Sequence, residues 1–132
     1  MRICLDLDGV IAQLRKSDQT YSDLLPVPGA VEKIKALKSS GHYIIIQTAR
    51  HMKTCEGNVG LVNARITRDT LQWLEDNEVP FDEIFFGKPW AQIYIDDNGF
   101  RFESWHDIGE DGAGLPKNRE ISHAQVNQPE EN

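Results

Sequence analysis

The sequence predicts a doubly wound α/β domain, in which a mainly parallel sheet carries helices on both faces. Three observations support this: short runs rich in Ile, Phe and Tyr alternate with helical patterns, one run is apolar almost throughout, and polar residues follow several of the runs. A strand that is apolar on both sides is typical of a parallel sheet covered on both faces. At 132 residues, the chain has the length of a single domain.

Four short segments have the composition of strands, and polar or turn-forming residues bound each of them. The second, HYIIIQT, is the run that is apolar almost throughout. The expected strands are residues 2–7, 42–48, 83–86 and 92–96.

A helix is expected in each of the two connections between the first three strands. The first helix begins near Pro28 and ends before Gly41, a residue suited to the turn that follows a helix. The second runs from about Thr67, its N-cap, to Asn77, with Asp69 in its first turn. The spacing of apolar residues predicts the side chains that face inward, namely Val31, Ile34 and Leu37 in the first helix and Leu71 and Leu74 in the second.

Three segments break this alternation. Residues 12–27 are long for a connection between a strand and a helix, which predicts a flap over the end of the sheet. Residues 51–66 are similarly irregular. From residue 107 onward the chain is acidic and contains several glycines, which predicts a flexible tail at 107–132 after a core of residues 1–106. The stretch GEDGAG in this tail lacks the Gly-Lys-Ser/Thr ending of a phosphate loop.

Charge and composition restrict the functional classes. A formal charge of −7 argues against nonspecific binding to nucleic acid or to an anionic membrane. No apolar run reaches the roughly 18 residues that span a bilayer, and the N-terminus lacks the apolar stretch of a signal peptide, so a cytoplasmic protein is expected. Cys4 and Cys55 do not have the spacing of a metal site.

Polar side chains come directly after the expected strands, where the carboxyl ends of parallel strands meet at one edge of the sheet. Ligands bind at this edge in open α/β sheets. Several carboxylates facing one lysine fit a hard cation and a phosphoryl group better than a purely structural network. The residues concerned are Asp6, Asp8, Thr48, Arg50, Lys88, Asp96 and Asp97.

The motifs DLDGV, IIIQTAR, FGKP and IYIDDN occur in this order, and together they resemble the four motifs of the haloacid dehalogenase (HAD) superfamily. The likeness covers about residues 2–100 and is greatest to small phosphatases without a large cap domain, of the kind found with sugar-phosphate and surface-polysaccharide biosynthesis. It implies a Rossmann-like three-layer sandwich with a short flap and no large cap. It also implies a Mg²⁺-dependent phosphomonoester hydrolase for a small phosphorylated metabolite, with a sugar phosphate expected.

The resemblance assigns a role to each matching residue. Asp6 matches the nucleophile that forms an aspartyl-phosphate, and a carboxylate that is ionised at neutral pH needs no base to activate it. Asp8 matches the general acid that protonates the leaving oxygen and then deprotonates the hydrolytic water. Thr48 and Lys88 match the groups that bind the phosphoryl oxygens. Contacts to the substrate are expected from Gly9, Thr48, Ala49, Arg50 and Lys88.

A magnesium site is also implied by the resemblance. Mg²⁺ favours oxygen ligands and keeps several waters. The implied ligands are the Asp6 carboxylate, the Asp8 backbone carbonyl and one acid of the Asp96–Asp97 pair. Asp97 is the expected direct ligand, with Asp96 turned towards Lys88.

Several alternatives stay open. The stretch DDNGF also fits an Asn-Gly hairpin turn, with FRFESW as a returning strand. Arg50 fits a contact to the substrate's phosphate, a contact to a second anionic group, or a pair with a neighbouring acid. Tyr21 fits either a substrate pocket or packing of the flap. The substrate could instead be a nucleotide or a nucleic-acid 3′ end, a phospho-receiver module is the non-enzyme alternative, and a neighbouring subunit could complete the open site.

Overall fold

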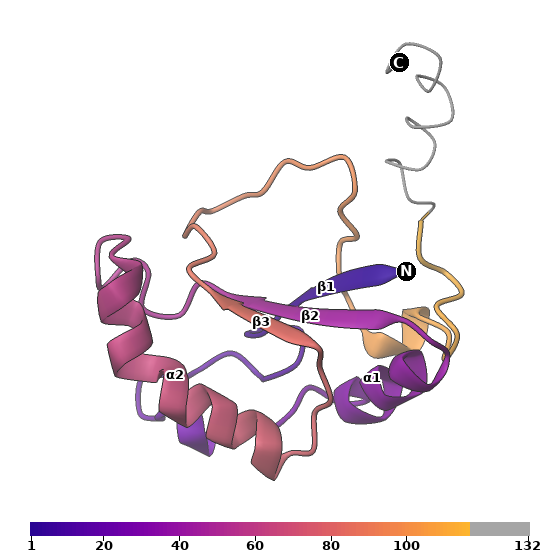
Figure 1. Cartoon of the computed structure of the whole chain (residues 1–132), viewed down its shortest axis with the longest axis horizontal. Coiled ribbons are helices and arrows are strands. Elements are labelled where there is room, and N and C mark those ends of the chain that lie inside the picture. The colour runs from indigo at the N-terminus through magenta and orange to yellow at the C-terminus, as the bar shows by residue number, and fades with distance from the viewer. Residues whose placement is uncertain (117–132) are drawn as a thin grey trace.

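The structure of the protein is a computed structural model that describes residues 1–116 (Figure 1). Three parallel strands form its sheet in the order β1 (Arg2–Asp6), β2 (Tyr43–Thr48) and β3 (Glu83–Phe86). The first three predicted strands are therefore confirmed within one or two residues. Register pairs Asp6 with Gln47 and Thr48 with Phe86, so the carboxyl ends of all three strands lie at one edge.

Helices α1 (Ala30–Ser39) and α2 (Val59–Asp76) connect consecutive strands, and both lie on the same face of the sheet (Figure 1). Burial along β2 alternates accordingly, because Ile44, Ile46 and Thr48 are buried and the residues between them are partly exposed. The small parallel α/β fold is as predicted. Residues 1–116 contain no helical layer on the other face, so the three-layer arrangement is not confirmed.

Helix α1 agrees closely with the prediction. Its residues Ile34 and Leu37 are buried and Val31 is partly buried against the core. Gly41 follows the helix with a φ of +93°, a conformation that glycine adopts without the steric penalty of a Cβ.

Helix α2 begins eight residues earlier than predicted. The Asn58 side chain accepts a hydrogen bond from the backbone N–H of Leu61 and caps the helix, so Thr67 is not its N-cap and Asp69 lies in its interior. Leu74 is buried as predicted, but Leu71 is 38% exposed. The extra turns carry Val62 and Ile66 into a small apolar cluster with Cys55, Met52 and Phe86, which holds the start of the helix against β3.

The predicted strand at 92–96 is wrong. Residues 89–101, here called the arm, contain neither helix nor strand and arch away from the sheet in Figure 1. Ile95 is 96% exposed. FRFESW forms no returning strand, so the hairpin interpretation is also wrong. Strand propensity is realised only through hydrogen bonds to a neighbouring strand. Within residues 1–116 the arm forms none with the outer edge of β1 or of β3, although both edges are unpaired.

Residues 107–116, assigned to the flexible tail from their composition, pack on the core instead. Ile108 is 4% exposed, and Trp105, just before it, is 2% exposed and donates a hydrogen bond from Nε1 to the Val10 carbonyl at 2.7 Å. Backbone hydrogen bonds close a turn from Gly109 to Ala113. The rest of the predicted tail, 117–132, lies outside the described residues.

The flap, residues 12–27, is irregular as predicted and contains one short 3₁₀ turn at Tyr21–Asp23. The side chain of Trp73 on α2 donates a hydrogen bond to the Leu24 carbonyl at 2.7 Å, which fixes the flap to the helix. Among residues 1–116, no helix has the length and apolar character needed to cross a membrane.

Candidate active site

The carboxyl edge of the sheet brings Asp6 and Lys88 together. The Nζ atom of Lys88 lies 3.4 Å from Oδ2 of Asp6, although the two residues are far apart in sequence. Lys88 is positioned by its backbone N–H, which donates to the Thr48 carbonyl at 3.1 Å. The turn before it needs Gly87, because φ is +106° and a Cβ there would lie 3.1 Å from the side chain of Val59.

The carboxyl group of Asp6 is partly exposed, and its surroundings shift its pKa. Its side chain is 36% exposed, and Oδ1 accepts a hydrogen bond from the Leu7 backbone N–H at 3.0 Å. Burial raises the pKa of Asp6 above its usual range, and the Lys88 ammonium group opposes this effect. Lys88 therefore favours the ionised form of Asp6, which is the nucleophilic form.

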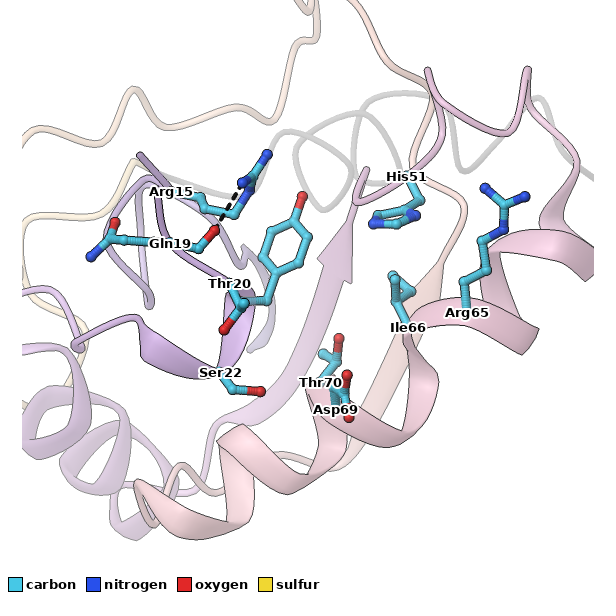
Figure 2. Close-up of a pocket in the computed structure, with 10 residues that line it drawn as sticks. Arg15, Gln19, Thr20, Ser22, His51, Arg65, Ile66, Asp69 and Thr70 are labelled. Carbon is cyan, nitrogen blue, oxygen red and sulfur yellow. Dashed lines mark hydrogen bonds between the residues drawn. The ribbon is translucent and has the colours of Figure 1, made fainter. Parts of the chain in front are cut away.

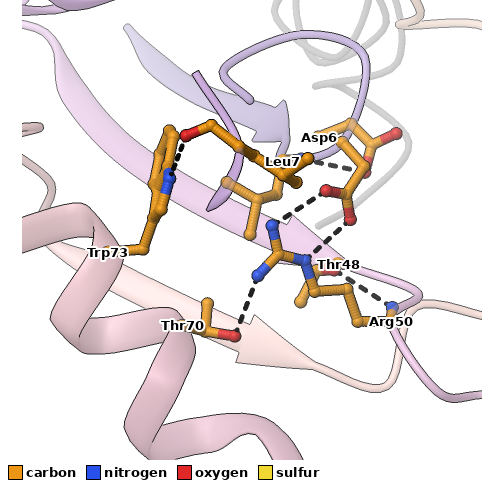
Figure 3. A network of polar contacts seen from close by, with 8 residues as sticks. Asp6, Leu7, Thr48, Arg50, Thr70 and Trp73 are labelled. Atoms are coloured by element: carbon orange, nitrogen blue, oxygen red, sulfur yellow. Dashed lines mark hydrogen bonds and ion pairs between the residues drawn. The ribbon is translucent and has the colours of Figure 1, made fainter. Parts of the chain in front are cut away.

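Asp8 is held by an arginine rather than by Lys88. Arg50 donates from Nε to one carboxylate oxygen of Asp8 and from Nη2 to the other, both at 2.9 Å. A third donor of Arg50, Nη1, donates to the Thr70 hydroxyl at 3.2 Å (Figure 3). The Arg50 side chain is 1% exposed, so this pair is almost completely removed from water on the arginine side. Of the three interpretations of Arg50, the structure shows the pair with a neighbouring acid.

Thr48 lies at the predicted edge but is fully buried. Its hydroxyl oxygen accepts a hydrogen bond from the backbone N–H of Arg50 at 3.1 Å (Figure 3). In this arrangement Thr48 shapes the turn after β2 and does not face solvent. Ala49 lies in the same turn, partly exposed.

Gly9 occupies a tight turn after β1. Its φ is +91°, and its N–H donates to the Ala12 carbonyl at 2.7 Å. The predicted sharp exit of the chain after Asp8 is therefore present, and glycine fits it because a side chain would be strained at this φ.

The predicted metal ligands do not all come together. Asp96 and Asp97 lie on the arm with exposed side chains, and Asp96 accepts a hydrogen bond from the backbone of Asn98 at 2.8 Å. Within residues 1–116, no group of three His, Cys, Asp or Glu side chains is close enough to hold a metal ion. Of the implied side-chain ligands, only Asp6 lies at the sheet edge, whereas Asp96 and Asp97 lie on the arm. The described residues therefore do not form a complete magnesium site.

Several contacts near the site were not predicted from the sequence. The aromatic ring of Tyr94 lies 4.1 Å from the Lys88 Nζ atom, and its hydroxyl donates to the Pro89 carbonyl at 2.5 Å. The ring of Tyr21 lies 4.2 Å from the Arg50 guanidinium carbon. Thr70 sits within α2 and has no motif around it. These contacts depend on the packing of distant segments, so no local signal identifies them.

No protein-family model matches the chain, and no curated protein is significantly similar to it. Among solved structures, a chain of the Pnkp1/Rnl/Hen1 complex is similar at 19% identity and a TM-score of 0.50, covering 74% of this chain and 30% of that one. That likeness concerns the fold. A crystal structure of a protein from Vibrio cholerae matches at 35% identity and a TM-score of 0.71, covering 98% of this chain and 99% of that one. Because the identity is this high over nearly the full length of both proteins, the chain belongs to the same family as the Vibrio cholerae protein.

Proposed function

We propose that the protein is a phosphomonoester hydrolase of the HAD type that acts through an aspartyl-phosphate intermediate. The expected substrate is a small phosphorylated metabolite, such as a sugar phosphate. The observation that carries the proposal is the pairing of a partly exposed carboxylate, Asp6, with the Lys88 ammonium group at 3.4 Å on the carboxyl edge of a parallel sheet. This pair offers a nucleophile and a cation for the phosphoryl oxygens at the same point.

The proposed reaction has two steps. In the first, a carboxylate oxygen of Asp6 attacks phosphorus, the bond from phosphorus to the leaving oxygen breaks, and that oxygen takes a proton from the protonated carboxyl group of Asp8, a form in which one of its oxygens no longer accepts from Arg50. In the second, a water molecule attacks the phosphorus of the aspartyl-phosphate, Asp8 accepts its proton, and Asp6 is released with inorganic phosphate. Lys88 offsets the negative charge of the phosphoryl oxygens in both steps. Proton transfer of this kind typically accelerates a reaction by about 10²–10⁴-fold.

Arg50 is a positioning residue in this scheme. Both oxygens of Asp8 accept hydrogen bonds from its guanidinium group, so the orientation of the carboxyl group is fixed before substrate arrives. Proton transfer at Asp8 requires one of these two contacts to weaken. The contact with Thr70 keeps the guanidinium in place when that happens.

We further propose that the reaction requires Mg²⁺, as the HAD resemblance implies. A bound Mg²⁺ would supply additional positive charge at the phosphoryl group. Asp6 and the Asp8 backbone carbonyl are the candidate ligands at the sheet edge, and Asp97 on the arm is the candidate third ligand. The steps above use the side chains of this chain alone.

Phosphate release from a panel of phosphorylated metabolites, with and without added Mg²⁺, tests the proposal. The wild-type chain should release phosphate catalytically, and Asp6→Asn should reduce turnover by several orders of magnitude while the protein stays folded by circular dichroism. Asp8→Asn should slow sugar phosphates more than activated aryl phosphates, because a good leaving group needs less protonation. Full activity of Asp6→Asn would show that the proposed mechanism is wrong.

A second candidate is a nucleotide or polynucleotide 3′-phosphatase with the same chemistry. The fold likeness to a chain of the Pnkp1/Rnl/Hen1 complex is compatible with this alternative. The net charge of −7 disfavours a polynucleotide substrate. Nucleotides and 3′-phosphorylated oligonucleotides belong in the same panel, and a kcat/KM for them above that of every sugar phosphate would favour the second candidate.

A further inference from the structure

A cavity of about 370 Å³ lies between the flap and α2, beside the candidate active site. The flap contributes one wall and a face of α2 contributes the other, and Figure 2 shows His51 and Arg65 near one another at one end, with Asp69 and Thr70 further along the helix. We call this cavity the flap pocket. Its charged or titratable lining residues are Arg15, Tyr21, His51, Arg65 and Asp69.

The flap pocket is adjacent to the proton-transfer residue. Arg50 contacts Asp8 on one side, and on the other it contacts Tyr21 and Thr70, which both line the pocket. One side chain therefore separates the pocket from Asp8.

The electrostatics of the flap pocket favour an anion. Burial lowers the pKa of His51, and the positive charges of Arg65, Arg15 and Arg50 lower it further. Arg50 has a carboxylate partner in Asp8, whereas Arg65 and Arg15 form no ion pair within residues 1–116. The one acid in the lining, Asp69, also forms no ion pair among these residues. The lining of the pocket thus presents two guanidinium groups, those of Arg15 and Arg65, that form no ion pair within residues 1–116.

The imidazole of His51 adds an unused polar atom. Its Nδ1 is buried and has no hydrogen-bond partner among the described residues, which is unusual for a buried nitrogen. The ring packs against Tyr21 with the centroids 5.9 Å apart, so it is held in place beside the pocket. In the tautomer with hydrogen on Nδ1, this atom can donate to a ligand oxygen.

We propose that the flap pocket binds a second anionic group of the substrate, a carboxylate or a second phosphate, while the reacting phosphate lies at Asp6. This inference rests on the proposed phosphatase function and narrows its substrate class. Arg65 and Arg15 supply the charge, and His51 supplies a hydrogen bond. The substrate is therefore a phosphorylated metabolite with two separated anionic groups.

Matched substrate pairs that differ by one anion test the proposal. Two such pairs are glucose 6-phosphate with 6-phosphogluconate, which adds a carboxylate, and fructose 6-phosphate with fructose 1,6-bisphosphate, which adds a phosphate. In at least one pair the doubly anionic member should have a kcat/KM about tenfold higher, mainly through a lower KM. The preference should decline as ionic strength rises. The pair that shows it distinguishes a carboxylate from a phosphate.

Arg65→Ala should abolish this preference by raising the KM of the doubly anionic member about tenfold. Arg68→Ala is the matched control, because Arg68 is an exposed arginine on the same helix that does not line the pocket. The proposal is overturned if wild type treats both members of every pair alike, if Arg65→Ala slows both members equally, or if Arg68→Ala has the same effect.

Binding measured by calorimetry tests the flap pocket independently of the proposed phosphatase function. The same compounds are titrated into the full chain carrying Asp6→Asn, which cannot turn them over. Tighter binding of the doubly anionic member that depends on Arg65 supports the flap pocket even if wild type releases no phosphate. Equal binding of both members overturns the pocket proposal even if wild type is an active phosphatase.

Discussion

Asp6 and Asp8 are two residues apart, but their carboxyl groups have different neighbours, and replacing each by asparagine should change stability in opposite directions. Burial raises the pKa of Asp6, so its ionisation at pH 7 costs folding free energy, and that cost is absent below the carboxylate range. Asp6→Asn should therefore raise the free energy of unfolding at pH 7, by at most about 1 kcal/mol because the side chain is partly solvent-screened. Asp8→Asn should lower it by about 3 kcal/mol, because it leaves the buried Arg50 without its counter-charge.

Urea denaturation of both variants at pH 7 and at pH 4 measures these effects. The gain from Asp6→Asn should shrink at pH 4, where the wild-type carboxyl is increasingly protonated. A change of the same sign in both variants at pH 7 would contradict the electrostatic difference described above.

The ammonium group of Lys88 lowers the pKa of Asp6 against the effect of burial. Replacing it in Lys88→Met should raise that pKa further, so the acid limb of the kcat/KM profile should move to higher pH. The plateau should also fall by about 10²-fold, because the phosphoryl oxygens lose a cation. The pH profile with an aryl phosphate is the measurement. Lys35→Met on the exposed surface of α1 is the control, and an unshifted acid limb in Lys88→Met would show that the pair does not tune Asp6.

At the scale of elements, one hydrogen bond joins the flap to α2. Trp73→Phe keeps most of the ring but removes the donor to the buried Leu24 carbonyl, which should cost about 1–2 kcal/mol. It should also weaken the preference for doubly anionic substrates, since the flap forms one wall of the pocket. Chemical denaturation and the substrate pairs measure the two effects. Trp90→Phe is the control, because Trp90 is 48% exposed, and equal losses in both variants would contradict this role of Trp73.

Local pattern was sufficient to predict the elements whose environment repeats along the chain. Strands β1, β2 and β3 are short apolar runs, and helix α1 has an apolar periodicity that matches its burial. Gly9 and Gly41 were also predictable, because each occupies a turn with positive φ. The convergence of Asp6, Thr48 and Lys88 followed from the rule that parallel strands end at one edge.

Tertiary contacts decided the rest. The first turns of α2 look irregular in sequence because Gly57 and Gly60 disfavour a helix, but Asn58 caps it and Val62 packs on β3. The arm has the composition of a strand, but within residues 1–116 it forms no backbone hydrogen bonds with either edge strand of the sheet, so propensity alone predicted wrongly. The pairing of Arg50 with Asp8 joins positions 42 residues apart, and no local pattern could choose it from the three alternatives.

At the scale of the whole molecule, the C-terminal part of the described chain packs on the core beside the turn that follows β1. Trp105 is 2% exposed and bonds to Val10, which follows Gly9 directly. Trp105→Ala should lower the free energy of unfolding by about 3–5 kcal/mol, because it removes a buried indole and leaves the Val10 carbonyl without its donor. Denaturation monitored by circular dichroism measures the loss. Trp90→Ala should cost less than about 0.5 kcal/mol, and a comparable cost at both sites would contradict the integration of this segment.

Magnesium, if it binds as proposed, must bring the arm towards the sheet edge, because Asp97 lies on the arm and Asp6 ends β1. Arg101 at the end of the arm is exposed, so trypsin should cleave after it in the absence of metal. Millimolar Mg²⁺ should slow that cleavage several-fold in wild type, and chelation with EDTA should restore it. Asp97→Asn should lose the protection, while Asp96→Asn should retain most of it, because Asp97 is the proposed direct ligand. Mass spectrometry identifies the cleaved bond, and sodium chloride at equal ionic strength controls for screening. Cleavage at the same rate with and without Mg²⁺ would mean that the metal, whatever its effect on turnover, does not draw the arm to the end of β1.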